Sequence, residues 1–482
     1  MTQELQALIK HLRQQLPANR LLLESEQCAV YACDALAVYS ETPALVVLAE
    51  SEAEVQTVVK AAARFQVPLV ARGAGTGLSA GALPKRDGML LVTSRMREIL
   101  ELDPTRRIAR VQPGVVNARV SEAARVHGLY YAPDPSSHIA CSVGGNVAEN
   151  AGGVHCLKYG VTVNNVQSLR LVDARGEILC MGAHRGEQTG MDLLALVHGS
   201  EGCLGIVTEI TLSLTPMPEK TRTLLAVYDK VRPACDAVSA IIRAGIIPAA
   251  MEMMDHFAIQ AAEAFCQPGY GQGANAVLLI DLDGHPLEVA AELEQVRTLL
   301  ALSGAARVQE AADETQRQRW WKGRKSAFPA IGRLSPDYYC IDGTVPRGRI
   351  GDVLEGIQAL SDRYGLRVSN VFHAGDGNLH PLILFDASLP GELEKTERLA
   401  ADILALCVDV GGTITGEHGV GREKYDQMAL QFSDAEIGQF LRVKAALDPQ
   451  QLFNPDKHVP TLARCREYRQ LRARQAGEPA HE

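Results

Sequence analysis

A glycine-rich stretch with little charge, residues 133–160, constrains this chain more than any other segment. It reads PDPSSHIACSVGGNVAENAGGVHCLKYG and has glycines at positions 144, 145, 152, 153 and 160. Glycine lets backbone N–H groups approach a ligand closely and adopts positive φ without strain. The stretch therefore predicts the floor of a channel for a large, flat, phosphate-bearing cofactor. The alternative is a set of tight turns in an ordinary loop.

Length and composition indicate a globular enzyme of two or three domains. The chain has 482 residues, a formal net charge of −9 and a pI near 5.9. An acidic balance argues against nucleic acid or an anionic membrane as the main partner. The 11 cysteines include no CxxC pair, so no disulfide framework or iron–sulfur motif is indicated. We therefore expect a reducing, cytoplasmic compartment and no transmembrane segment.

The first half begins with a β-α-β unit that ends in a second glycine-rich loop. We expect strands at 44–48 and 67–70 on either side of a helix at 51–65. The loop that follows, RGAGTGLS at 72–79, lacks the last glycine of the fingerprint GxGxxG because Leu78 stands there. Its backbone N–H groups and hydroxyls suit an anion nest for a pyrophosphate, or else form a plain turn.

Three motifs, in this order and spacing, resemble the FAD-binding domain of the vanillyl-alcohol oxidase/p-cresol methylhydroxylase flavoproteins. They are RGAGTGLSAGALP, the stretch at 133–160, and GSEGCLGIVTEITL. Within this superfamily the chain is most similar to the FAD-linked D-2-hydroxyacid dehydrogenase branch, which includes the flavin subunits of glycolate oxidases and the D-lactate dehydrogenases. The resemblance covers nearly the whole chain.

The resemblance implies a set of flavin-binding residues. Those expected to hold the pyrophosphate are Arg72, Gly73, Gly75, Thr76, Gly77 and Ser79. Those expected to line the rest of the flavin are Pro133, Ser136, Gly144, Asn146, Asn150, Gly153, Gly160, Glu201, Ile206 and Asn454. Relatives with a covalent flavin often carry a histidine where this chain has Thr76, so the FAD is expected to be noncovalent.

The second half predicts an α+β cap. Strands at 223–228 and 275–281 alternate with helices at 232–243, 286–302 and 348–364, which suggests an antiparallel sheet with helices on one face. The predicted fold class is α+β: a two-subdomain FAD-binding domain of the p-cresol methylhydroxylase type plus this cap. The predicted domains are a FAD-binding domain at 1–218, a substrate or cap domain at 219–410, and a C-terminal segment at 411–482 that returns to the flavin domain.

An aromatic-basic cluster, WWKGRK at 320–325, follows a helical run. It is typical of a solvated helix face with buried rings. The alternative, favoured by the resemblance, is that Arg324 grips a substrate carboxylate in the bidentate manner of a guanidinium. Relatives that oxidise dicarboxylates are expected to have a second cation just before residues 342–346. This chain has Tyr-Tyr-Cys at 338–340, which favours a short monocarboxylate.

Two histidine-containing motifs predict a metal site. His373 and His380 flank a glycine-rich turn, and TGEHGVGR follows at 415–422. The two histidines alone are typical of buried core residues whose hydrogen bonds are satisfied. Two imidazoles and a carboxylate, however, can hold zinc or manganese and leave coordination positions of the metal open for a substrate. The resemblance implies that His373, His380 and Glu417 are the metal ligands and that His418 is the catalytic base.

The expected function is FAD-dependent oxidation of a short 2-hydroxy acid, with glycolate to glyoxylate as the leading reaction. Alternatives are oxidation of D-lactate, a noncatalytic flavin subunit that relays electrons, and a metal hydrolase without redox chemistry. The resemblance implies companion flavin and iron–sulfur subunits of a glycolate oxidase complex. Through such partners the chain would be peripheral to the inner membrane.

Overall fold

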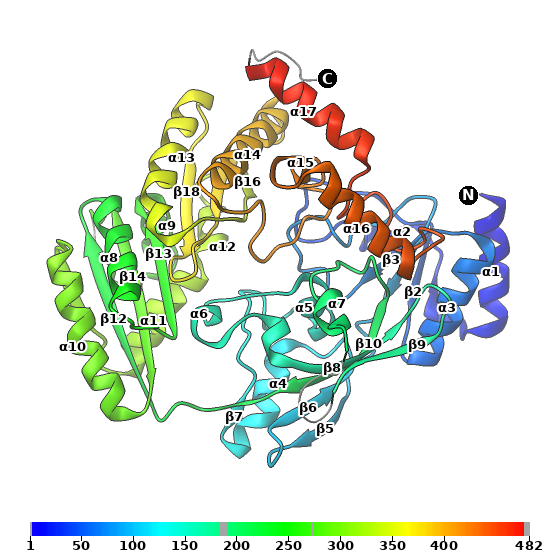
Figure 1. Cartoon of the computed structure of the whole chain (residues 1–482), viewed down its shortest axis with the longest axis horizontal. Coiled ribbons are helices and arrows are strands. Elements are labelled where there is room, and N and C mark those ends of the chain that lie inside the picture. The colour runs from blue at the N-terminus through cyan, green and yellow to red at the C-terminus, as the bar shows by residue number, and fades with distance from the viewer. Residues whose placement is uncertain (1, 184–189, 272, 477–482) are drawn as a thin grey trace. The chain divides into compact units, whose positions relative to one another are not determined.

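The computed structural model describes residues 2–183, 190–271 and 273–476, and it divides the chain into two compact units (Figure 1). Unit 1 comprises Met1–Gly152, Val161–Pro216 and Glu417–Glu482, and unit 2 comprises Gly153–Gly160 and Met217–Gly416. The glycine-rich stretch is thus shared between the units, because its last part, 153–160, belongs to unit 2.

Unit 1 contains two larger sheets and a two-stranded antiparallel pair of β7 and β11. The first has the order β1-β2-β4-β3, in which β2, β4 and β3 are parallel. The second is antiparallel, with the order β5-β6-β10-β8-β9. The strands are β1 Leu21–Leu22, β2 Leu45–Leu48, β3 Leu69–Arg72, β4 Met89–Val92, β5 Ile99–Asp103, β6 Ile108–Val111, β7 Leu129–Tyr130, β8 Val166–Val172, β9 Ile178–Gly182, β10 Ile206–Ser213 and β11 Thr215–Pro216.

Apolar faces fix the helices of unit 1 on these sheets. In α1, Leu5, Leu8 and Leu12 are fully buried and share a core with the buried face of α3. Ser51 begins α3 by accepting a hydrogen bond from the backbone N–H of Glu54. The helices are α1 Gln3–Gln15, α2 Ser25–Ala29, α3 Glu52–Phe65, α4 Asn117–Ala124, α5 Val143–Glu149, α7 Leu193–Val197, α15 Met428–Gln431, α16 Asp434–Leu447 and α17 Leu462–Ala476.

The C-terminal segment of unit 1 adds to the edge of the first sheet. Phe453 forms a parallel bridge with Leu69, and the backbone N–H of Leu69 donates to the carbonyl of Leu452. The Phe453 side chain is fully buried in the same core as α1 and α3. Residues far apart in the sequence therefore complete one core.

Unit 2 is built on a large antiparallel sheet with the order β15-β12-β14-β13-β18-β19-β17, and β20 joins β16 to β18. The strands are β12 Lys220–Tyr228, β13 Ala250–Asp255, β14 Ala276–Gly284, β15 Arg307–Glu310, β16 Asp337–Cys340, β17 Gly343–Thr344, β18 Val368–His373, β19 Asn378–Leu379 and β20 Pro381–Phe385. The helices are α6 Cys156–Tyr159, α8 Val231–Arg243, α9 His256–Cys266, α10 Pro286–Leu302, α11 Glu314–Lys325, α12 Ala327–Ile331, α13 Ile350–Tyr364 and α14 Glu392–Asp409.

Helices cover both faces of this sheet, so the expectation of helices on one face was wrong. Along β14 every residue from Ala276 to Asp283 is buried, whereas a strand with one solvated face would alternate. The face that carries Val277 and Leu279 packs on α9 and α11. The helices α8 and α10 also pack on β12 and β14, as Figure 1 shows within unit 2.

Most strands and helices expected from the sequence are present, but some elements were missed. Residues 143–149 form α5 within the stretch for which turns were the alternative. The apolar run at 240–251 divides into the end of α8 and the start of β13, with Pro248 between them. The tail beyond residue 460, which has no apolar periodicity, forms α17 and pairs Arg464 and Arg469 with acidic residues of unit 1.

We expect Phe453→Ala to lower the free energy of unfolding of unit 1 by about 3 kcal/mol, because it leaves a cavity in a closed core. Urea unfolding followed by far-UV circular dichroism measures the change. The control is Leu471→Ala on α17, whose side chain is 53% exposed. Equal effects of the two substitutions would contradict the role of Phe453.

Candidate active site

The loop after β3 in unit 1 lies against the N-terminus of α5. Arg72 donates from Nη1 to the carbonyl of Cys33 at 2.7 Å, and Gly75 has a positive φ of 74°. A Cβ on Gly73 would overlap Oγ of Ser142, the residue that caps α5. Glycine is therefore required at position 73 for the loop to approach this helix.

Buried polar atoms around this loop fit a bound polar group. Ser79 is fully buried, and within the described ranges its Oγ has no hydrogen-bond partner. Within the same ranges, Oδ2 of Asp34 and Oε2 of Glu149 are also buried atoms without a hydrogen-bond partner. Buried polar atoms are nearly always paired, so such a set is typical of a ligand site. The loop and these atoms fit the phosphate and hydroxyl groups of FAD.

The other residues expected at the flavin occupy varied positions. Asn150 caps α5 with φ of 50° and accepts from the backbone N–H of Val163 at 2.9 Å. Ile206 is only 2% exposed and packs in the core of unit 1, so only its backbone is available to a ligand. Gly153 and Gly160 fall in the segment of unit 2. The other expected residues of unit 1 are Pro133, Gly144, Asn146 and Ser136, of which Ser136 is exposed. The loop after β3 contains Thr76 and Gly77.

Glu201 holds the loop at 419–421 in unit 1. It is 5% exposed, and it accepts from the backbone N–H groups of Val420 at 2.6 Å and Gly421 at 2.7 Å. The ring of His458 lies 2.8 Å from its Oε1. Burial raises the pKa of a carboxyl, but His458 and the two backbone donors hold the pKa of Glu201 below its ordinary value. The carboxylate thus stays charged while joining three segments.

Two further buried charges lie near the loop after β3. Burial raises the pKa of Asp34 to about 6, against the lowering effect of the Leu36 backbone N–H and Arg72. Burial lowers the pKa of Lys457 to about 8. The Lys457 ammonium donates to the carbonyl of Gly81 at 3.0 Å and to Oδ1 of Asn454 at 2.8 Å. Asn454 is thereby fixed beside the loop that follows Ser79.

In unit 2, one buried carboxylate joins the first histidine to the arginine. Glu252 on β13 is the register partner of His373 on β18, and its Oε1 lies 2.7 Å from Nδ1 of His373. Its Oε2 lies 2.6 Å from Nη2 of Arg324 on α11, and the three side chains are at most 4% exposed. Burial alone would raise the pKa of Glu252, but His373 and Arg324 hold it below its ordinary value.

The second histidine lies beside the first. The ring centroids of His373 and His380 are 5.2 Å apart and the rings are nearly perpendicular, at 86°. Nδ1 of His380 is 4.0 Å from Oδ1 of Asp342, a fully buried residue. Asp342 also accepts from the Thr415 hydroxyl at 2.6 Å and from the Gly416 backbone at 3.0 Å. These bonds fix the last residues of unit 2 next to the histidines.

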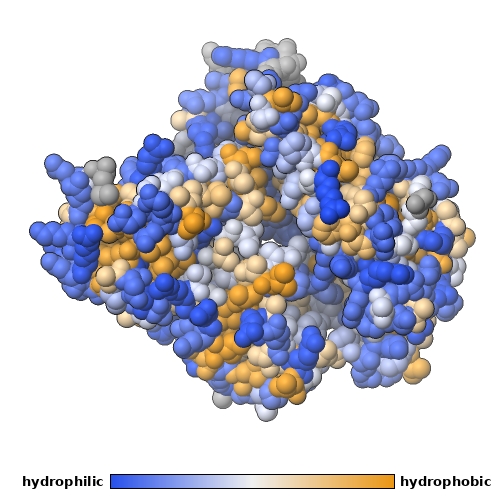
Figure 2. Space-filling view, turned by 180° about the vertical axis from the view of Figure 1, so that it is seen from behind, coloured by the Kyte–Doolittle hydropathy of each residue, from blue (hydrophilic) through white to orange (hydrophobic). Residues whose placement is uncertain are grey.

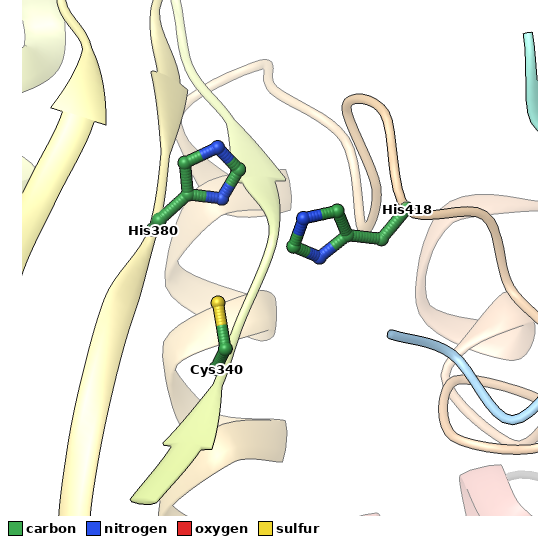
Figure 3. A group of neighbouring side chains, drawn as sticks. All are labelled: Cys340, His380 and His418. Carbon is green, nitrogen blue, oxygen red and sulfur yellow. The ribbon is translucent and has the colours of Figure 1, made fainter. Parts of the chain in front are cut away.

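In unit 2, ligand atoms of His380 lie within 4.8 Å of ligand atoms of His373 and of Cys340. Glu417 directly follows Gly416, where the chain leaves unit 2. Cys340 and His380, both of unit 2, are drawn in Figure 3. Nitrogen, sulfur and carboxylate donors suit zinc, and nitrogen with carboxylate also suits manganese. The residues present therefore fit a divalent cation.

Sequence reasoning missed Glu252 and Asp34, and it noted Cys340 only as a position without a cation. Glu252 lies in the run AMEMMD, where the available signal is a glutamate flanked on both sides by methionine. Acidic residues are almost never fully buried unless paired. A glutamate between two methionines therefore indicates a buried partner, although it does not say which one.

Comparison with family models identifies the chain. Residues 43–182 match the FAD binding domain, and residues 217–458 match the C-terminal domain of FAD linked oxidases. The chain belongs to the FAD-linked oxidase family. It is 54% identical over 457 residues to glycolate oxidase subunit GlcD of Escherichia coli K12, covering 95% of this chain and 92% of that one. The domain matches and these relatives establish that the protein is an FAD-linked oxidoreductase.

Other relatives share the same family. Glycolate oxidase subunit GlcD of Bacillus subtilis is 38% identical, with 91% of this chain and 93% of that one covered. A D-lactate dehydrogenase of Anaerostipes hadrus is 32% identical, with 91% and 94% covered. The structure of p-cresol methylhydroxylase with substrate bound superposes with a TM-score of 0.82 at 16% identity, covering 96% and 98%. These matches confirm the predicted superfamily and fold class.

In the part of the chain that the structure describes, no helix of this FAD-linked oxidase is both long and apolar enough to span a bilayer. In Figure 2 hydrophilic residues cover most of the face shown, and hydrophobic residues gather in smaller groups, one of them at the lower centre.

We expect Gly73→Ala to weaken FAD binding about fivefold, because the new methyl group displaces the Ser142 cap, an interaction worth about 1 kcal/mol. FAD fluorescence on titration of the flavin-depleted protein measures the dissociation constant. The control is Gly348→Ala, where an added Cβ meets no atom within 4 Å. Unchanged FAD affinity in Gly73→Ala would show that the loop after β3 does not hold the flavin.

The raised pKa of Asp34 predicts a pH dependence of stability. The folded protein holds this proton more tightly than the unfolded chain, so the stabilisation is complete below pH 3.8 and is lost as the pH rises through about 6. Between pH 5 and pH 7 the free energy of unfolding should therefore fall by about 1 kcal/mol more in the wild type than in Asp34→Asn. Urea titrations at both pH values test this, with exposed Asp87→Asn as the control.

Proposed function

We propose that this protein oxidises a short 2-hydroxy acid, with glycolate to glyoxylate as the leading reaction. The observation that carries the proposal is the pair of adjacent imidazoles, His373 and His380, in unit 2, supported by buried Glu252 and Arg324. The 54% identity to a glycolate oxidase subunit supports the choice of substrate. A hydrolase is disfavoured, because both family matches are to FAD-linked domains.

In the proposed mechanism the chain orients the substrate and moves one proton. Arg324 binds the substrate carboxylate through charge-assisted hydrogen bonds. His418 accepts the proton of the C2 hydroxyl as this carbon is oxidised to a carbonyl. FAD, when bound noncovalently, supplies N5 as the acceptor of the hydride that leaves C2. A divalent cation on His373, His380 and Glu417, zinc or manganese, would lower the pKa of the substrate hydroxyl.

The residues beside His380 favour a small substrate. Cys340 ends β16, and its Sγ belongs to the same group of ligand atoms as His380 (Figure 3). Its neighbour Tyr339 is 2% exposed. Neither side chain supplies the positive charge that a second carboxylate would need. We therefore propose a monocarboxylate as the substrate.

A second candidate is D-lactate, which differs from glycolate by one methyl group. The 32% identity to a D-lactate dehydrogenase over most of both chains favours it. One methyl group in a pocket changes binding by only about 1–3 kcal/mol, so both acids could be oxidised at different rates.

We also propose that the protein works with companion subunits. The GlcD relatives are named as subunits. From the similarity to them we propose a second flavoprotein and an iron–sulfur protein as the partners. We propose a cytoplasmic location, in which such partners would hold the chain at the inner face of the membrane. A purely electron-relaying role is disfavoured, since it would not need the histidines, Glu417 and Arg324.

The substrate is tested by anaerobic bleaching of the flavin absorbance. We expect glycolate to bleach the purified protein fastest, D-lactate more slowly, and D-2-hydroxyglutarate least, because no second cation is supplied beside His380. Fastest bleaching by D-lactate would establish the second candidate. A yellow protein that none of these acids bleaches would favour the relay subunit, and a colourless one would favour a hydrolase.

His418→Ala is expected to lower the rate of flavin reduction by glycolate at least about 100-fold, since a positioned general base contributes about 10²–10⁴. The flavin absorbance per protein should stay unchanged. Stopped-flow reduction under anaerobic conditions measures the rate. A wild-type rate in this variant would exclude His418 as the base.

A further inference from the structure

We propose that Glu252 is a positioning residue that sets the metal-binding nitrogen of His373 and the orientation of Arg324 together. This inference rests on the proposed function, because it assigns a role in holding the cation and the substrate carboxylate. All the contacts that carry it lie within unit 2.

The contact between Glu252 and His373 selects one ring nitrogen. Oε1 lies 2.7 Å from Nδ1, and the two residues are paired across β13 and β18. A carboxylate accepts only, so Nδ1 carries the proton in the neutral ring. Nε2 is then the basic nitrogen that can coordinate a cation. Carboxylates in this position orient metal-binding histidines and raise their basicity.

The contact between Glu252 and Arg324 fixes the guanidinium. Oε2 lies 2.6 Å from Nη2 in a pair that is 1% and 2% exposed. The guanidinium is a rigid planar fork, so one fixed nitrogen restricts where the other donors point. Within the described residues, Nε of Arg324 is buried and has no hydrogen-bond partner. A buried, unpartnered donor beside a fixed one is suited to an anionic ligand.

The two contacts use the two oxygens of a single carboxylate. Moving Glu252 would therefore disturb His373 and Arg324 at once, even though they come from β18 and α11. Removing one member of a buried charged pair leaves the other charge uncompensated, which is strongly unfavourable. We expect metal binding and substrate binding to depend jointly on this residue.

Asp255 on the same strand provides a matched control. It is also a carboxylate of β13, but its oxygens accept from the Ala258 N–H at the start of α9 and from the Asn370 backbone. Neither His373 nor Arg324 contacts it in any of the hydrogen bonds or ion pairs described. Asp255→Asn should lower stability without changing metal affinity.

The decisive variant is Glu252→Gln, which keeps the size and removes the charge. We expect its affinity for Zn²⁺ or Mn²⁺ to fall about 10–100-fold in the metal-depleted, flavin-loaded protein, measured by competition with a chelating dye. The KM for glycolate should also rise, with the flavin content unchanged. Metal affinity and KM like those of the wild type would overturn the inference.

A second variant, Arg324→Lys, keeps the inference testable if Glu252→Gln does not fold. Arg324 is not a proposed metal ligand. We therefore attribute any fall in the metal affinity of the Arg324→Lys protein to the displacement of Glu252, which contacts both Arg324 and His373. We expect a measurable fall there and none in Asp255→Asn, and equal affinities would contradict the coupling. If the wild type binds neither Zn²⁺ nor Mn²⁺, the metal part of the proposed function fails as well. If the wild type binds the metal and both variants bind it with the same affinity, the proposed role of Glu252 fails and the proposed function does not.

Discussion

A buried carboxylate shared between a histidine and an arginine is the interaction on which unit 2 depends. Removing Glu252 and Arg324 from water carries a large desolvation cost, which is offset only when both charges are fully paired. Glu252 reduces that cost by placing one oxygen against Arg324 and the other against His373. The sheet supplies the geometry, because β13 and β18 place Glu252 and His373 directly opposite each other.

Unit 1 uses a comparable device around its glycine-rich loops. Glu201 is buried and accepts from two successive backbone N–H groups, at Val420 and Gly421, while His458 approaches the same carboxylate. Glycine permits this approach, since a Cβ on Gly421 would overlap the carbonyl of Ser79. A segment more than 200 residues away in sequence is thereby joined to the expected flavin loop. The close backbone packing explains why these motifs contain so many glycines.

Local patterns predicted local structure well and long-range packing poorly. The helix expected at 51–65 is present as α3, and the glycine-rich turn between His373 and His380 connects β18 to β19. The strand β13 was missed because Pro248 follows an apolar, helix-like run and the strand's own residues show no alternation. Both of its faces are buried under helices, which removes the period-two signal that identifies a strand.

The sequence by itself determined the family, the FAD-linked oxidoreductase chemistry and the motifs that carry the candidate ligands, because these depend on residue types at fixed local spacing. Only the tertiary structure brought the ring of His373 beside that of His380 and revealed Glu252 as the partner of His373. Glu252 and His373 are separated by 121 positions in the chain. Their pairing follows from the register of two strands, and register is set by the packing of the whole sheet.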